Sequence, residues 1–147
     1  TFSGSITKGS IQNKAQIPLI KSGVLQRMIS NGLVANAFAK SLCGDNPDPA
    51  AMSVFIDVFR AQDLKSLVPI LQAFSDEDRA DRLGQIAKPT IVICGRKDST
   101  TPPWQSERLS TLIKGARMVW VEGAGHMINW EAPESLVDAI QEVSAPA

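Results

Sequence analysis

The stretch Lys88-Pro89-Thr90-Ile91-Val92-Ile93-Cys94-Gly95-Arg96-Lys97-Asp98 contains a short apolar run between two chain-breaking residues. Pro89 precedes the run, Gly95 ends it, and most side chains between them are β-branched. A short apolar run of this kind is typical of a strand that is buried on both faces, as in a parallel sheet covered by helices. We therefore expect a strand here, with Asp98 in the loop that follows it.

A second run, residues 116–122, predicts another strand, and a helix predicted over residues 106–113 separates the two. The glycine-rich sequence Gly123-Ala124-Gly125-His126 follows this second strand and contains the only histidine of the chain. A strand–helix–strand unit in one sheet is right-handed and parallel, so both strands end at the same edge. Asp98 and His126 are therefore expected at the edge where open α/β sheets bind ligands.

Four segments in this order resemble the C-terminal part of an α/β-hydrolase-fold enzyme: residues 86–98, Thr101-Pro102-Pro103, Val121 to His126 (VEGAGH) and Glu131 to Glu134 (EAPE). The resemblance covers roughly residues 81–143. It implies an α/β fold, namely the C-terminal part of a doubly wound, mostly parallel sheet with a helical cap. It also implies that Asp98 is the acid and His126 the base of a Ser–Asp–His triad, since the family's triad has that order along the chain.

The nucleophile elbow of the family, G-x-S-x-G or a close variant, does not occur in the sequence, and the family's oxyanion-hole loop is missing too. The chain also starts at Thr1 rather than at Met. Two explanations are an expressed fragment and the C-terminal chain of a processed precursor, as reported for acyltransferases that resemble homoserine acetyltransferase. We expect the second, with a separate N-terminal chain that carries the nucleophile elbow and the oxyanion hole.

The expected organisation has three segments. Residues 1–14 are predicted to be the end of a core strand and a loop, residues 15–80 a helical cap, and residues 81–147 the C-terminal α/β core with the triad acid and histidine. A sheet with only half of its strands would expose an unpaired edge, which also favours a partner chain.

The predicted cap has the apolar spacing of several short helices. Gly23 and the pair Asn31-Gly32 interrupt the first pattern, Pro49 suits the first position of the next helix, and Asp63 can cap a further one. The larger apolar side chains form either a helix-on-helix core or the lining of an apolar substrate pocket: Met28, Phe38, Met52, Phe55 and Phe59.

The composition excludes several classes of partner. Lysine plus arginine and aspartate plus glutamate both total 15, so there is no reason to expect nucleic acid or an acidic membrane surface. One histidine and two scattered cysteines cannot supply a closed metal site, so no metal and no cofactor is expected. Without a signal-like N-terminus, we expect the protein to be cytoplasmic.

The assignment of Asp98 and His126 has alternatives. A lone histidine beside glycines is often a core or surface imidazole, and Asp98 is alternatively the cap of the helix that follows it. Asp76, Asp78 and Asp81 are other acids, but they precede the strand. Glu131 is expected to start the last helix, over residues 133–143, whose Leu136, Val137 and Ile140 would pack on the sheet.

The resemblance predicts a hydrolase of a carboxylic ester, thioester or lactone. A hydroxyl nucleophile needs a base near neutral pH, which histidine supplies, and a carboxylate holds the imidazole in the useful tautomer. Acyl transfer to an alcohol or thiol, amide hydrolysis, dehalogenation, C–C hydrolysis and a non-catalytic binding module stay open as alternatives. An N-terminal-nucleophile hydrolase using Thr1 would need several strands with period-two alternation, which the sequence does not contain.

Overall fold

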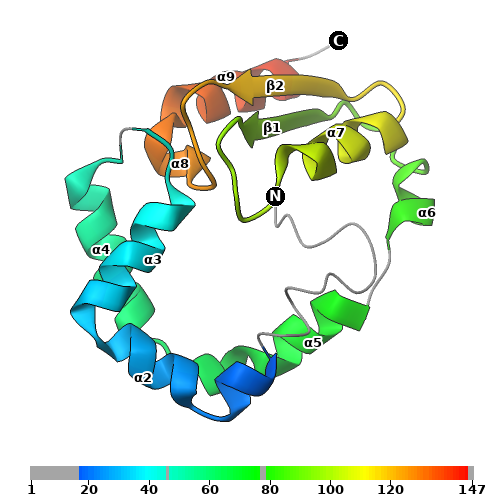
Figure 1. Cartoon of the computed structure of the whole chain (residues 1–147). Coiled ribbons are helices and arrows are strands. Elements are labelled where there is room, and N and C mark those ends of the chain that lie inside the picture. The colour runs from blue at the N-terminus through cyan, green and yellow to red at the C-terminus, as the bar shows by residue number, and fades with distance from the viewer. Residues whose placement is uncertain (1–16, 46, 77–78, 146–147) are drawn as a thin grey trace. The chain divides into compact units, whose positions relative to one another are not determined.

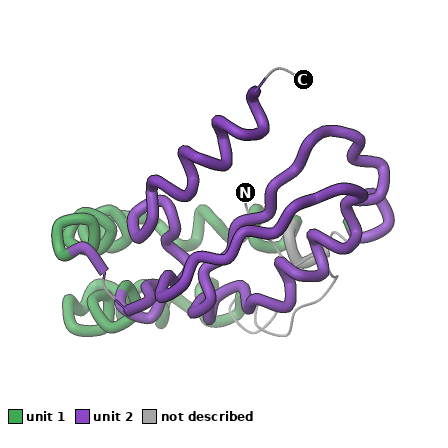
Figure 2. Tube along the Cα trace, turned by 90° about the horizontal axis from the view of Figure 1, so that it is seen from above, with its two compact units in different colours: residues 1–39, 49–79 green, residues 40–48, 80–147 purple. Residues whose placement is uncertain are grey.

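The computed structural model describes residues 17–45, 47–76 and 79–145 (Figure 1). The strand expected within residues 1–14 lies outside these described residues. The chain divides into two compact units, one within residues 1–39 and 49–79 and the other within residues 40–48 and 80–147 (Figure 2). None of the described helices is long and apolar enough to cross a membrane.

Both described strands lie in the second half of the chain, and the other described elements are helices (Figure 1). In chain order they are α2 (Val24–Ser30), α3 (Gly32–Leu42), α4 (Pro49–Ala61), the 3₁₀ helix η1 (Leu64–Leu67), α5 (Val68–Asp76), α6 (Ala80–Leu83), β1 (Ile91–Gly95), α7 (Pro103–Leu112), β2 (Arg117–Val121), α8 (Ile128–Glu131) and α9 (Pro133–Ser144).

The first unit is helical, and its helices end where the sequence predicts. Gly23 has φ 75°, a left-handed conformation that glycine adopts without steric cost, and it separates residues 17–21 from α2. Asn31 leaves the helical conformation between α2 and α3. Asp63 accepts a hydrogen bond from Lys65 N and so caps η1, which confirms the predicted cap.

The core of the first unit consists of buried aliphatic side chains from separate helices, namely Ile20, Ile29, Leu64 and Val68. Aromatic rings form a stack beside it: the centroids of Phe38 and Phe59 are 4.9 Å apart, and those of Phe55 and Phe59 are 5.6 Å apart. Of the residues named for a core or pocket role, Met52 is buried, the three rings pack on one another, and Met28 and Phe38 are exposed.

The second unit contains a parallel two-stranded sheet, as predicted. β1 pairs with β2 from Ile91↔Arg117 to Gly95↔Val121. Figure 2 shows α9 on one side of the two strands and α7 on the other. Val92 and Cys94 of β1 are buried. The helix between the strands begins at Pro103, three residues before the predicted start, because the fixed φ of proline fits the first helical position.

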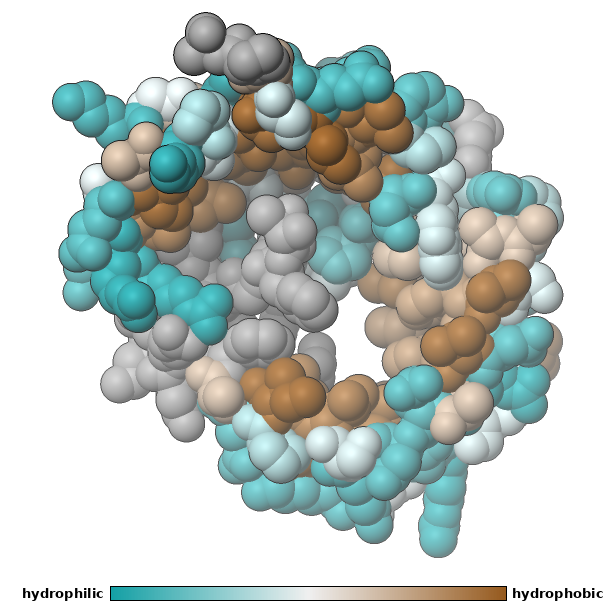
Figure 3. Space-filling view, turned by 180° about the vertical axis from the view of Figure 1, so that it is seen from behind, coloured by the Kyte–Doolittle hydropathy of each residue, from teal (hydrophilic) through white to brown (hydrophobic). Residues whose placement is uncertain are grey.

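Two predictions about the C-terminal end are wrong. Glu131 does not start the last helix: it is the last residue of the single-turn helix α8, and α9 begins at Pro133. Of the three side chains expected to pack on the sheet, Leu136 is partly buried, but Val137 and Ile140 are 49% and 54% exposed; Ala139 is the buried residue of α9. Figure 3 shows the resulting apolar surface over α9, the brown area beside the grey atoms at the top.

Candidate active site

The loops that follow β1 and β2 are hydrogen-bonded to each other just beyond the sheet. Arg96 N donates to Val121 O at 3.1 Å, and Lys97 N donates to Ala124 O at 2.9 Å. These bonds continue the parallel pairing past Gly95 and Val121. They carry Asp98 and His126 to the same edge of the sheet, as the sequence predicts.

Asp98 is the only buried charged residue among the described ones, with 7% of its surface exposed. Its Oδ1 accepts hydrogen bonds from Thr100 N at 2.9 Å and Thr101 N at 2.8 Å, and its Oδ2 accepts one from Thr101 Oγ1 at 2.7 Å. The backbone bonds order the turn before α7, but Asp98 does not cap that helix, whose N-cap is Pro102 without a side-chain hydrogen bond. A carboxylate held in this way has little freedom to rotate.

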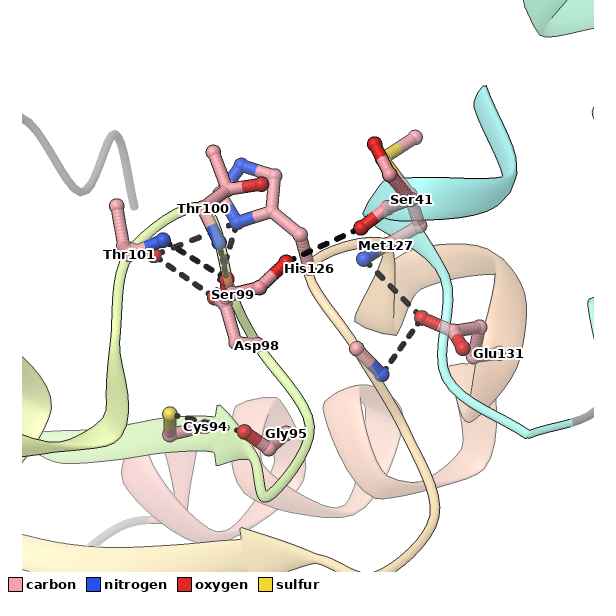
Figure 4. A network of polar contacts seen from close by, with 11 residues as sticks. Ser41, Cys94, Gly95, Asp98, Ser99, Thr100, Thr101, His126, Met127 and Glu131 are labelled. Atoms are coloured by element: carbon pink, nitrogen blue, oxygen red, sulfur yellow. Dashed lines mark hydrogen bonds and ion pairs between the residues drawn. The ribbon is translucent and has the colours of Figure 1, made fainter. Parts of the chain in front are cut away.

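His126 lies against this carboxylate. Its Nδ1 is 2.9 Å from Asp98 Oδ2 and 3.3 Å from Thr101 Oγ1. An ionised carboxylate only accepts hydrogen bonds, so Nδ1–H donates and Nε2 of the neutral ring becomes the proton acceptor. Figure 4 shows Nε2 turned away from Asp98. The His126 side chain is 29% exposed.

The two groups shift each other's proton affinity in opposite directions. Burial acts to raise the pKa of Asp98, but hydrogen bonds from His126 and Thr101 outweigh it and hold that pKa below its ordinary value. The hydrogen bond with Asp98 raises the pKa of His126 above its ordinary value; burial opposes the rise, and the negative charges of Asp98 and Glu131 add to it. An imidazole of this kind is stabilised when it carries a proton.

Glycine lets the histidine loop approach two other segments closely. A Cβ at Gly95 would overlap the carbonyl oxygen of Gly125, and a Cβ at Gly125 would lie 2.6 Å from the carbonyl carbon of Cys43. A Cβ at Gly44 would overlap the carbonyl oxygen of Gly123. The backbone of residues 42–45 therefore lies directly against the loop of residues 123–127.

Glu131 contributes to the site in a way that the sequence did not indicate. Its carboxylate accepts hydrogen bonds from three backbone N–H groups: Gly44 N, Gly125 N at 3.0 Å and Met127 N at 3.2 Å. Figure 4 shows it beside the histidine loop. No local signal in the sequence identifies this role, because its bond to Gly44 depends on a contact between segments 87 residues apart.

Two further acids with described side chains, Glu122 and Asp81, are exposed. Glu122 pairs with Arg96 at 3.0 Å, and Asp81 lies on α6. Asp76 ends α5, and Asp78 lies outside the described residues. Within the part of the chain that the structure describes, no group of three or more His, Cys, Asp or Glu side chains could hold a metal ion.

Several known proteins resemble part of this chain. The family described as alpha/beta hydrolase fold matches residues 68–133, which include both Asp98 and His126. A pimeloyl-[acyl-carrier protein] methyl ester esterase of Neisseria meningitidis is 34% identical over 70 residues, which are 48% of this chain and 27% of the esterase. A proline iminopeptidase of Saccharolobus solfataricus is 30% identical over 73 residues, 50% of this chain and 23% of that protein.

The fold is also that of solved structures. An esterase from Exiguobacterium antarcticum superimposes with a TM-score of 0.72 at 19% identity, covering 91% of this chain and 48% of that one. This chain thus spans about half the length of that esterase, and its match covers about a quarter of each curated relative. With a parallel sheet, helices on both sides and two characteristic loops at its edge, the chain has the C-terminal part of the α/β-hydrolase fold and resembles proteins of that superfamily.

Proposed function

We propose that this chain is part of a hydrolase that cleaves a carboxylic ester, thioester or lactone through a Ser–Asp–His type triad. His126 is the base, Asp98 is the acid that orients it, and the nucleophile comes from outside this sequence. The observation that carries the proposal is the 2.9 Å contact of His126 Nδ1 with a buried carboxylate whose remaining bonds fix its position.

The chemistry follows from this geometry. As the nucleophile's oxygen attacks the acyl carbon, Nε2 of His126 takes the proton of that oxygen, and Asp98 stabilises the imidazolium that forms. The imidazolium then donates the proton to the leaving alcohol or thiol. In the second half, the same nitrogen takes a proton from the water that attacks the acyl carbon. It then returns this proton to the nucleophile's oxygen as the bond between that oxygen and the acyl carbon breaks and the acid leaves. The raised pKa of His126 suits the imidazolium state of this cycle.

The substrate class is supported by the relatives. The names of the Neisseria and Exiguobacterium proteins describe esterases, and that of the Saccharolobus protein describes a peptidase, so each acts on an acyl bond. An acyltransferase of the same fold is the alternative, because the same pair of side chains could pass the acyl group to an alcohol or a thiol instead of water.

The nucleophile is proposed to lie on the N-terminal chain of the same precursor, together with the oxyanion hole. Within the described residues, β1 pairs only with β2, so its other edge is open to a further strand. The esterase of similar fold is about twice as long as the region that it shares with this chain. Both observations fit a partner polypeptide that extends the sheet beside β1.

The test is turnover of p-nitrophenyl esters by the assembled enzyme, meaning this chain bound to its partner. We expect His126→Ala to lower kcat by roughly 10⁴-fold or more and Asp98→Asn by roughly 10⁴-fold, the latter through the wrong imidazole tautomer. Asp81→Asn is the matched control, since Asp81 is an exposed acid on α6, and it should leave kcat unchanged.

Normal turnover in either the His126 or the Asp98 variant would contradict the role assigned to that residue. Products formed with added alcohols distinguish the alternatives: a dominant transfer product would favour the acyltransferase. Loss of labelling by a serine-directed fluorophosphonate in the His126 variant would further support a hydroxyl nucleophile that this histidine activates.

A further inference from the structure

We propose that Glu131 is a positioning residue, which fixes the backbone on both sides of His126 and ties it to residues 42–45. The proposal rests on the function proposed above, because it assigns Glu131 a task in that reaction. Glu131 touches neither His126 nor any reacting atom. It acts through the three backbone groups that its carboxylate holds.

The first step of the argument is the arrangement of these donors. Gly125 N and Met127 N, which flank His126 in the chain, both donate to Oε2, at 3.0 Å and 3.2 Å. Two bonds from residues on either side of one residue restrict the backbone rotations that would move its side chain. The imidazole needs such restriction, because an error of about 1 Å in a catalytic group can cost about a hundredfold in rate.

The second step is the partner of Oε1. Gly44 N donates to this oxygen from a segment 87 residues earlier in the chain. That segment makes two further bonds to the histidine loop: His126 N donates to Leu42 O at 2.7 Å, and Asp45 N donates to Gly123 O at 2.8 Å. The bond from Gly44 N to Glu131 thus adds to the contact between residues 42–45 and the histidine loop, in which the backbone N–H of His126 also takes part.

The third step is the support of Glu131 itself. It is the last residue of α8, and its own N–H donates to Met127 O at 2.9 Å. Met127 therefore accepts a bond from the Glu131 backbone and donates one to the Glu131 side chain. These two hydrogen bonds between Met127 and Glu131 hold the carboxylate against the histidine loop, although α8 is only one turn long.

The residue type fits the task. A carboxylate has two oxygens that only accept, so it can satisfy three N–H donors at once. Glutamine has one carbonyl oxygen and an NH₂ group, so it could still serve the two donors that share Oε2 but would face the Gly44 N–H with another donor. The negative charge of Glu131 also raises the pKa of His126, although Asp98 is the larger cause of that rise. It raises the pKa of Cys43 as well, where burial is the larger cause.

The test uses isotope-labelled chain and nuclear magnetic resonance, since the single histidine gives an unambiguous imidazole titration. We expect Glu131→Ala to increase the exchange rates of the Gly44, Gly125 and Met127 amides by about tenfold or more, as for the loss of one hydrogen bond each. Glu131→Gln should accelerate Gly44 alone. Both variants should lower the pKa of His126, because the charge is lost in each.

Glu134→Gln is the matched control: it removes an exposed carboxylate three residues away, in the first turn of α9, and should change neither observable. An unchanged His126 pKa in both folded Glu131 variants, or unchanged exchange of the three amides in Glu131→Ala, would overturn the proposal.

These readouts need neither substrate nor nucleophile, so they separate this proposal from the proposed function. If the assembled enzyme hydrolyses no ester but the amides and the imidazole respond as expected, the reaction class is wrong and the positioning by Glu131 stands. If hydrolysis depends on His126 while Glu131→Ala leaves the imidazole and the amides unchanged, the proposed function stands and the positioning role of Glu131 is wrong.

Discussion

At the scale of single residues, the site depends on how fully Asp98 is bonded. Its two oxygens receive hydrogen bonds from two backbone groups, one hydroxyl and the imidazole. A buried charge is costly unless it is paired in this way. The same bonds that make burial tolerable also fix the direction in which the carboxylate meets His126, so the stability of the loop and the orientation of the base have one cause.

The opposite pKa shifts of this pair predict how stability depends on pH. The pKa of Asp98 is lowered on folding, so its contribution is present above about pH 3.9, the unfolded value, and is lost as pH falls through the folded pKa. The pKa of His126 is raised, so its contribution is complete below about pH 6.5 and is lost as pH rises through the folded pKa. We expect maximal stability between these limits.

The measurement is the free energy of unfolding in urea at a series of pH values. His126→Asn should flatten the decline above about pH 6.5, because no other histidine is present to cause it. Asp98→Asn should also flatten the decline on the acid side. A wild-type alkaline decline that persists unchanged in the His126 variant would show that another group causes it.

The meeting of Asp98 and His126 could be predicted from the sequence, whereas the groups around them could not. Two strands with an intervening helix are enough to place both residues at one edge, and the structure confirms that placement; their catalytic roles stay predictions. Thr101 and Glu131 act through a hydroxyl and a carboxylate whose targets are set by three-dimensional contacts. Nothing in their local spacing specifies those contacts.

At the scale of elements, glycines decide how closely the segments approach. Gly44→Ala would place a Cβ where the carbonyl oxygen of Gly123 lies, and backbone cannot yield as a flexible side chain can. We expect this substitution to lower the free energy of unfolding by about 1–3 kcal/mol or more, as other overpacking substitutions do. Because residues 42–45 hold the histidine loop, the imidazole resonance of His126 should shift as well.

Gly84→Ala is the control for this prediction. The nearest atom to a Cβ at Gly84 is Leu112 O at 3.8 Å, an ordinary contact, and no positive φ opposes a side chain there. Its effect should stay within about 0.5 kcal/mol. Equal effects of the two substitutions, measured by urea unfolding, would mean that the close contact at Gly44 does not exist in solution.

The elements themselves were predicted unevenly, for physical reasons. Both strands and the long helices have a clear apolar pattern and clear end signals, and they were found. The four-residue helix α8 is too short to show any periodicity, so its last residue, Glu131, was assigned to the next helix. In α9 the apolar positions predict a buried face, but Val137 and Ile140 stay exposed because no described segment covers them.

At the scale of the whole molecule, two exposed features of the described residues fit the partner polypeptide that we propose. The sheet of the described residues has two strands, which leaves polar backbone groups unpaired along its edges, and α9 presents apolar side chains to solvent. Unpaired edges and apolar surface both favour association with another chain. We therefore expect the natural form to be a complex.

Native and denaturing mass spectrometry of material purified from its source would test this expectation. The native mass should exceed the 15.8 kDa of this chain, and the denatured sample should contain a second polypeptide with a nucleophile elbow. The same second polypeptide should take the fluorophosphonate label. A folded, monodisperse species of 15.8 kDa without a companion would exclude the two-chain enzyme.

The register of the sheet has a consequence for how this site can change. Gly95 and Val121 are paired, and the acid and the base follow them after three residues (98 − 95) and five residues (126 − 121). One inserted or deleted residue in either loop would shift a side chain by about 3.3 Å along the backbone, which exceeds the distance that now joins the two. A change in the length of either loop would therefore separate the acid from the base.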